Sequence, residues 1–64
     1  MKIKQLVDLI DYPDDVIIII YDYAKSDVVY SGLVESIPEY YLEEDIKGVE
    51  IPSKNEIMLN IKTN

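Results

Sequence analysis

Segment 16–23, which reads VIIIIYDY, constrains the fold of this chain more than any other part of its sequence. The run is β-branched and aromatic, which is typical of a β-strand. Side chains alternate between the two faces of a strand, and here both faces are mostly apolar. One face carries Val16, Ile18, Ile20 and Asp22, and the other carries Ile17, Ile19, Tyr21 and Tyr23. The fold must therefore explain what covers two faces of a single strand.

Two covers are available for the second face once a helix covers the first. Segment 37–42 can fold back and place Ile37, Tyr41 and Leu42 over the strand. Alternatively, a second copy of the chain covers it, because small apolar-rich domains without disulfides often associate. An uncovered strand of this composition is an aggregation hazard. The sequence leaves both covers open.

The N-terminal segment predicts an amphipathic helix over residues 3–10. Pro13 stops this helix, because the residue before a proline is pushed toward extended geometry. Lysines in the first turn and aspartates in the last oppose the helix dipole, so the helix needs a surface on which to dock. Its apolar side chains recur at helical spacing, at Ile3, Leu6, Val7 and Ile10.

A β-hairpin follows. Residues 24–27 form a polar break of hairpin-loop length after the strand 16–23, and residues 28–34 return as a second strand. Gly32 lies inside that strand, where a glycine marks a bulge or a point of close packing.

A short helix and a second hairpin complete the chain. Segment 36–39, Ser-Ile-Pro-Glu, matches a capping box, in which Ser36 caps the helix and Glu39 reaches back. It predicts a short helix through Leu42, and strands follow at 46–51 and 57–61. Residues 1–64 thus form a single small α+β domain, with the N-terminal amphipathic helix packed on a four-stranded, mainly antiparallel sheet of two hairpins.

The size and composition of the chain limit how it can be stabilised. A domain of 64 residues buries only about 60% of the surface that its unfolded chain exposes, so its net stability is small. The chain has no cysteine and no histidine, which excludes disulfides, thiolate metal sites and the usual general base. Association is the remaining route to extra stability.

The charge balance is acidic, with 13 Asp and Glu, 6 Lys and a formal net charge of −7. Binding to nucleic acid or to anionic membranes needs clustered cations, so we expect neither. A basic protein partner is compatible with this charge. Asp8 and Asp11 interrupt the N-terminal apolar stretch, so we expect no signal peptide and a cytoplasmic location.

No arrangement of side chains indicates catalysis or a metal. The acidic run from Asp8 to Asp15 lacks the glycine and distal glutamate of a calcium loop, and Pro13 interrupts it. The serines have no histidine base, and the two glycines form no phosphate-binding pattern. We therefore expect a protein that is not an enzyme and that holds no cofactor and no metal.

Tyrosines and an acidic cluster are the candidates for a protein-binding surface. Six tyrosines are many for this length, and tyrosine suits an interface because it packs through its ring while its hydroxyl remains hydrated. Adjacent carboxylates can steer a basic partner. The candidate contact residues are Tyr21, Tyr23, Tyr40, Tyr41, Glu43, Glu44 and Asp45.

The opening MKIKQLVDLID and the segment YSGLVESIPEYYLEEDIKGVEI resemble small uncharacterised proteins of phages and prophages in low-GC Gram-positive bacteria. The likeness rests on the lysine-bearing helix, on Tyr30-Ser31-Gly32 in the second strand and on Ile37-Pro38-Glu39 at the helix start. The resemblance implies a phage or mobile-element origin in a bacterial cytoplasm, and it carries over no catalytic residue.

The leading hypothesis is a non-enzymatic phage or prophage accessory protein that binds another protein, as a homodimer. A first alternative is an acidic nucleic-acid mimic that inhibits a host DNA- or RNA-binding protein. A second alternative is a small structural or assembly component whose dimer is the functional unit.

Overall fold

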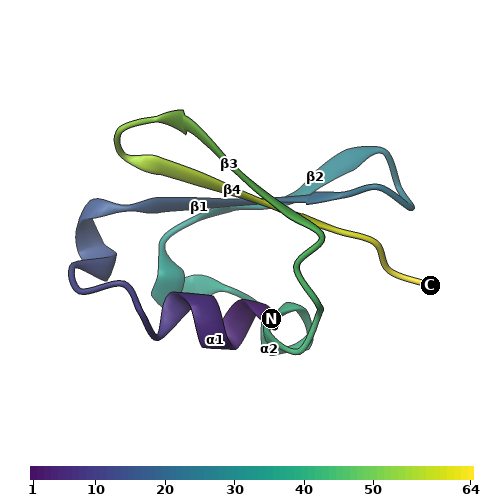
Figure 1. Cartoon of the computed structure of the whole chain (residues 1–64), viewed down its shortest axis with the longest axis horizontal. Coiled ribbons are helices and arrows are strands. Elements are labelled where there is room, and N and C mark those ends of the chain that lie inside the picture. Colours follow the sequence, from purple (N-terminus) through teal and green to yellow (C-terminus); the bar gives the residue numbers. More distant parts are fainter.

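The computed structural model describes all 64 residues and contains a four-stranded sheet with two short α-helices on one side of it (Figure 1). Two 3₁₀ turns, η1 and η2, precede β1 and α2 along the chain. The elements are α1 (Ile3–Val7), η1 (Pro13–Asp15), β1 (Ile17–Asp22), β2 (Asp27–Gly32), η2 (Val34–Ser36), α2 (Glu39–Leu42), β3 (Gly48–Ser53) and β4 (Glu56–Ile61). The α+β class predicted from the sequence is confirmed.

The strand order is β2-β1-β4-β3, and the two central strands run parallel. Both predicted hairpins form, so β1 pairs with β2 and β3 pairs with β4 in antiparallel fashion. The connection 33–47 passes beneath the sheet, from the end of β2 to the start of β3 at the opposite end of the sheet. Because of this crossing, β4 runs parallel to β1. The mainly antiparallel sheet is thus confirmed in part.

The N-terminal helix is shorter than its apolar pattern predicts. α1 ends at Val7, and the amides of Leu9 and Ile10 donate to carbonyls three residues earlier, which tightens the chain into a turn. Ile10 still packs against the core, whereas Leu9 is 70% exposed. The amphipathic pattern therefore correctly predicts that Ile3, Leu6, Val7 and Ile10 contact the core, although the helix ends earlier than predicted.

The segment after β2 differs from the expected strand and capping box. β2 ends at Gly32, and η2 replaces the last predicted strand residues. α2 has Pro38 at its N-cap and no side-chain cap, so the predicted capping by Ser36 is wrong. Ser36 lies inside η2, where its amide donates to the carbonyl of Leu33. The extent of the helix, through Leu42, is as predicted.

Gly32 is a point of close packing. The phenol of Tyr30 lies across it and donates a hydrogen bond to the carbonyl of Leu33. A Cβ atom on Gly32 would lie 2.8 Å from the Tyr30 hydroxyl, which is closer than atoms can pack. The glycine therefore allows Tyr30 to close the turn between β2 and η2.

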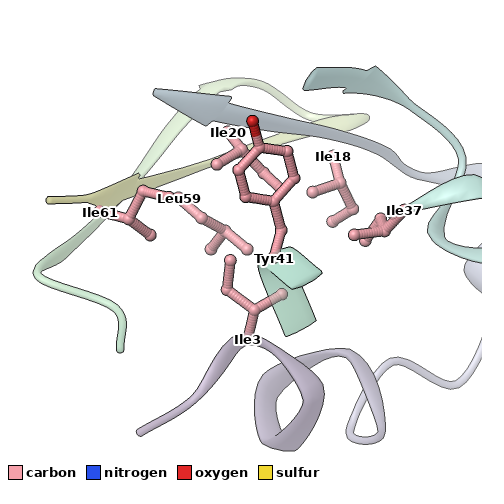
Figure 2. Packing of buried hydrophobic residues seen from close by; sticks show 7 residues of the cluster. All are labelled: Ile3, Ile18, Ile20, Ile37, Tyr41, Leu59 and Ile61. Atoms are coloured by element: carbon pink, nitrogen blue, oxygen red, sulfur yellow. The ribbon is translucent and has the colours of Figure 1, made fainter. Parts of the chain in front are cut away.

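The core lies between the sheet and the two helices (Figure 2). Isoleucine and leucine side chains from the two central strands point toward Ile3 of α1 and Tyr41 of α2. The buried cluster consists of Ile3, Ile18, Ile20, Ile37, Tyr41, Leu59 and Ile61.

Both helices cover the same face of β1. The predicted cover of the second face by segment 37–42 is therefore wrong. Ile37 and Tyr41 pack with Ile3 against Ile18 and Ile20, so segment 37–42 does not reach the second face. The α2 segment lies beside α1 because the crossover passes beneath the sheet on that side. The opposite face of the sheet has no cover from the chain itself.

Candidate protein-binding surface

The uncovered side of the sheet, which we call the open face, is built on the second face of β1. Ile17, Ile19 and Tyr21 lie on it and are half-buried by their neighbours. Side chains directly opposite each other on paired strands share a face, so the strand register identifies the rest. The register adds Val28, Ser31, Gly48, Glu50, Ser53, Glu56, Met58 and Asn60, and alternation along the chain adds Tyr23.

The centre of the open face is apolar. Met58 pairs with Ile19 across the β1–β4 boundary, and Ile17 lies one step along β1 on the same face. A register shift in β2 brings Val28, rather than Val29, opposite Tyr21. The apolar stripe therefore extends from β4 across β1 to the edge strand.

Two tyrosines end this stripe. The rings of Tyr21 and Tyr23 lie 5.5 Å apart between centroids at an interplanar angle of 77°, which is the edge-to-face arrangement that aromatic pairs favour. Tyr23 is 51% exposed. The pair thus presents a large apolar surface with hydroxyl groups that solvent can reach.

Polar side chains border the stripe on the β3 and β4 side. Asn60 is buried beside Tyr21, and its Nδ2 donates to Glu50 Oε2 at 3.0 Å. Gly48 leaves room for this amide, because a Cβ there would lie 3.3 Å from Asn60 Nδ2. Farther along, Ser53 Oγ donates to Glu56 Oε1 at 2.9 Å. Two carboxylates are thus held at this border by neutral donors.

The four tyrosines predicted as contact residues do not form one surface. Tyr21 and Tyr23 lie on the open face, whereas Tyr40 and Tyr41 belong to α2 on the opposite side of the sheet. Tyr41 is only 8% exposed and belongs to the core, with its ring 4.6 Å from that of Tyr40. Tyr40 is 70% exposed and is the only one of this second pair that a partner can reach.

The predicted acidic cluster fastens the N-terminus to the α2 segment. Glu43 accepts hydrogen bonds from Lys4 Nζ at 2.8 Å and Lys2 Nζ at 3.0 Å. The bonds from Lys4 and then Lys2 hold the pKa of Glu43 below its ordinary value, and the same contact raises the pKa of Lys2. The carbonyl of Glu44 accepts from the amide of Ile3, and Asp45 forms an isolated bridge with Lys2.

Glu43 is therefore already paired within the chain, while Asp45 remains exposed. The sequence analysis did not identify Met58, Glu50 and Glu56 as members of the face that carries Ile17, Ile19 and Tyr21. The alternation of the last strand does predict that Met58 and Asn60 lie on one face of that strand and Leu59 on the other. No sequence pattern, however, shows that this strand lies parallel beside β1.

Asp22 is buried at the end of β1 and faces the helix side. It accepts hydrogen bonds from the Thr63 hydroxyl and amide and from the Ala24 amide. These bonds, the Thr63 hydroxyl first, lower the pKa of the carboxyl. The carboxylate ties the C-terminal tail to β1, which is a structural role.

The surface has no pocket, and no group of acidic side chains has the arrangement of a metal site. No helix is long and apolar enough to span a bilayer. Comparisons with protein-family models, with curated proteins and with solved structures give no match.

Proposed function

We propose that this protein acts without catalysis, by binding another polypeptide through the open face of its sheet. The observation that carries the proposal is the contiguous apolar stripe of Ile17, Ile19, Tyr21 and Met58, which no segment of the chain covers. Removing apolar surface from water stabilises a complex by about 25 cal/mol per Å² before the costs of association are subtracted. A tyrosine pair beside aliphatic side chains has the composition of an interface centre.

A second copy of the chain is the second candidate for the partner. The same uncovered stripe favours it, because a homodimer joined face to face would remove the stripe from water. Its direct mark is a molecular mass in solution of twice the 7.4 kDa of the chain. In this form the protein is the structural or assembly component, and the dimer is the functional unit.

A nucleic-acid mimic has less support. Mimicry needs carboxylates spread along one surface in the manner of phosphates. In this fold Glu43 is paired with lysines on the helix side, while Glu50 and Glu56 lie at the border of the open face. A role as a phage or prophage accessory protein rests on the resemblance of the sequence alone and stays a prediction.

The proposal predicts that a charge on the open face abolishes binding without unfolding the domain. Met58→Lys places a cation in the stripe, and Leu9→Lys is the matched control because Leu9 is an exposed apolar residue on the helix side. In affinity capture from bacterial lysate, the wild type and Leu9→Lys should retain the same proteins, and Met58→Lys should lose them. Melting temperatures of the three proteins verify folding. Capture of the same proteins by folded Met58→Lys would rule out the open face as the binding surface.

A further inference from the structure

We infer that the occupant of the open face is a basic amphipathic helix of another protein, and not a second copy of this chain. The inference rests on the proposed function of the open face and names the chemistry of its partner. The basis is the distribution of charge: the ion pairs lie on the helix side, and the strands carry acidic residues without a paired lysine.

Every charged residue within the four strands is acidic. These residues are Asp22, Asp27, Glu50 and Glu56, and no strand contains a lysine. Of the four, Asp22 is buried on the helix side. Glu56 pairs with Ile17 and Glu50 pairs with Met58, so both of these carboxylates lie beside the apolar stripe. The open face thus combines an apolar centre with an anionic border.

The two border carboxylates are oriented but have no cation. Asn60 holds one oxygen of Glu50 and Ser53 holds one oxygen of Glu56, which leaves Glu50 Oε1 and Glu56 Oε2 without a hydrogen-bond donor. The ion pairs of the molecule join Lys2 and Lys4 to Glu43, on the helix side. A partner that brings Lys or Arg to this border gains charge-assisted hydrogen bonds to carboxylates that are already fixed in place.

The strands of a second copy offer no cation to this border. Of the lysines outside the Glu43 pairs, Lys25, Lys47 and Lys54 lie in turns and connections. Lys62 follows Ile61, so alternation places it beside Tyr23, at the end of the open face away from Glu56. Two chains of net charge −7 also repel each other as they approach. Charge complementarity therefore favours a cationic partner over self-association.

The shape of the face suits a helix. The opposite side of the same sheet is covered by α1 and α2, whose apolar side chains pack on alternate residues of β1 and β4. The six residues of β1 extend about 20 Å at about 3.3 Å each, and a helix of about 13 residues spans that length. An amphipathic helix with an apolar stripe flanked by Lys or Arg therefore matches the face in both length and charge.

The test uses two designed peptides of about 18 residues that share a leucine stripe at helical spacing. One carries lysines on its remaining positions and the other carries glutamates. Each is titrated into the full chain labelled with ¹⁵N, and the amide shifts report both the Kd and the surface contacted. We expect the lysine peptide to shift amides of β1 and β4, and the glutamate peptide to bind at least about tenfold more weakly. Raising salt from about 0.05 M to about 0.5 M should raise the Kd of the lysine peptide about tenfold.

A pair of charge-matched variants separates the border carboxylates from net charge. The variant E50Q/E56Q removes them but keeps the oxygen that accepts from Asn60 or Ser53, and D8N/D11N removes two exposed charges from the helix side. The first should weaken binding of the lysine peptide about tenfold, and the second by less than about twofold. Equal weakening by both variants would overturn the inference, because general attraction would then explain the binding.

Two other outcomes distinguish this inference from the proposed function. If the glutamate peptide binds β1 and β4 as tightly as the lysine peptide, or if the chain self-associates there and excludes both, the basic partner is refuted and the open face stands as a binding surface. If neither peptide shifts those amides and the chain remains monomeric, the proposed function fails with it.

Discussion

Asp22 is a buried carboxylate whose hydrogen bonds join the end of β1 to the C-terminal tail. Its pKa is lowered in the folded protein, so the unfolded chain binds its proton more readily than the folded chain does. The stability from this group is therefore fully present above its unfolded pKa of about 3.9, and it is lost as pH falls through the lower folded value. We expect Asp22→Asn to be less stable than the wild type above about pH 4.

Urea unfolding at a series of pH values measures this difference, because the linear extrapolation gives a free energy at each pH. The gap between the wild type and Asp22→Asn should close as the pH is lowered below about 4. A gap that stays constant down to about pH 2 would mean that the ionised carboxylate contributes nothing specific.

The close contact between Gly32 and the Tyr30 hydroxyl can be tested by substitution. A methyl group at position 32 would meet the Tyr30 hydroxyl at 2.8 Å, so Gly32→Ala must displace the phenol from the Leu33 carbonyl. We expect a loss of roughly 1–3 kcal/mol in the free energy of unfolding. In the Tyr30→Phe background the hydroxyl is absent, so the same substitution should cost less, and a double-mutant cycle measures the coupling. Additive losses would contradict the close contact.

The β1–β2 hairpin contains the one non-glycine residue with positive φ, Ser26 at 51°. This left-handed conformation strains a residue that carries a Cβ, and glycine adopts it freely. Ser26→Gly should therefore raise the free energy of unfolding by up to about 1 kcal/mol. Lys25→Gly, in the same turn without a positive φ, is the control and should give no gain. Thermal unfolding of both variants decides between local strain and a general effect of glycine.

Most elements follow from patterns that are local in the sequence. The VIIIIYDY run forms a strand because its β-branched side chains favour extended backbone, and α2 covers the residues that follow Pro38. The capping by Ser36 fails because η2 continues the turn and already uses the backbone of Ser36. The end of α1 at Val7 also escapes prediction, because element ends depend on the turn that follows.

The pairing of β1 with β4 is a property of the whole molecule. No local pattern in either strand encodes a parallel neighbour, because the pairing depends on the path of connection 33–47 beneath the sheet. That path places Tyr41 in the core and leaves Tyr21 on the open face. Of the predicted contact residues, Tyr40 and Tyr41 lie on the helix side of the sheet. Glu43 and Glu44 bond to the N-terminal segment.

In the whole molecule, one face of β1 packs in the core and the other lies on the open face. Ile18 is completely buried under the helices, and its chain neighbour Ile19 lies on the open face. The comparison of Ile18→Thr with Ile19→Thr tests this division most directly, because threonine keeps the β-branched shape at both positions. Urea unfolding of the two variants at low protein concentration is the measurement. We predict a loss of roughly 2–4 kcal/mol for Ile18→Thr and of less than about 1 kcal/mol for Ile19→Thr. Equal losses would contradict the account, because they would mean that the folded chain covers both faces of its central strand.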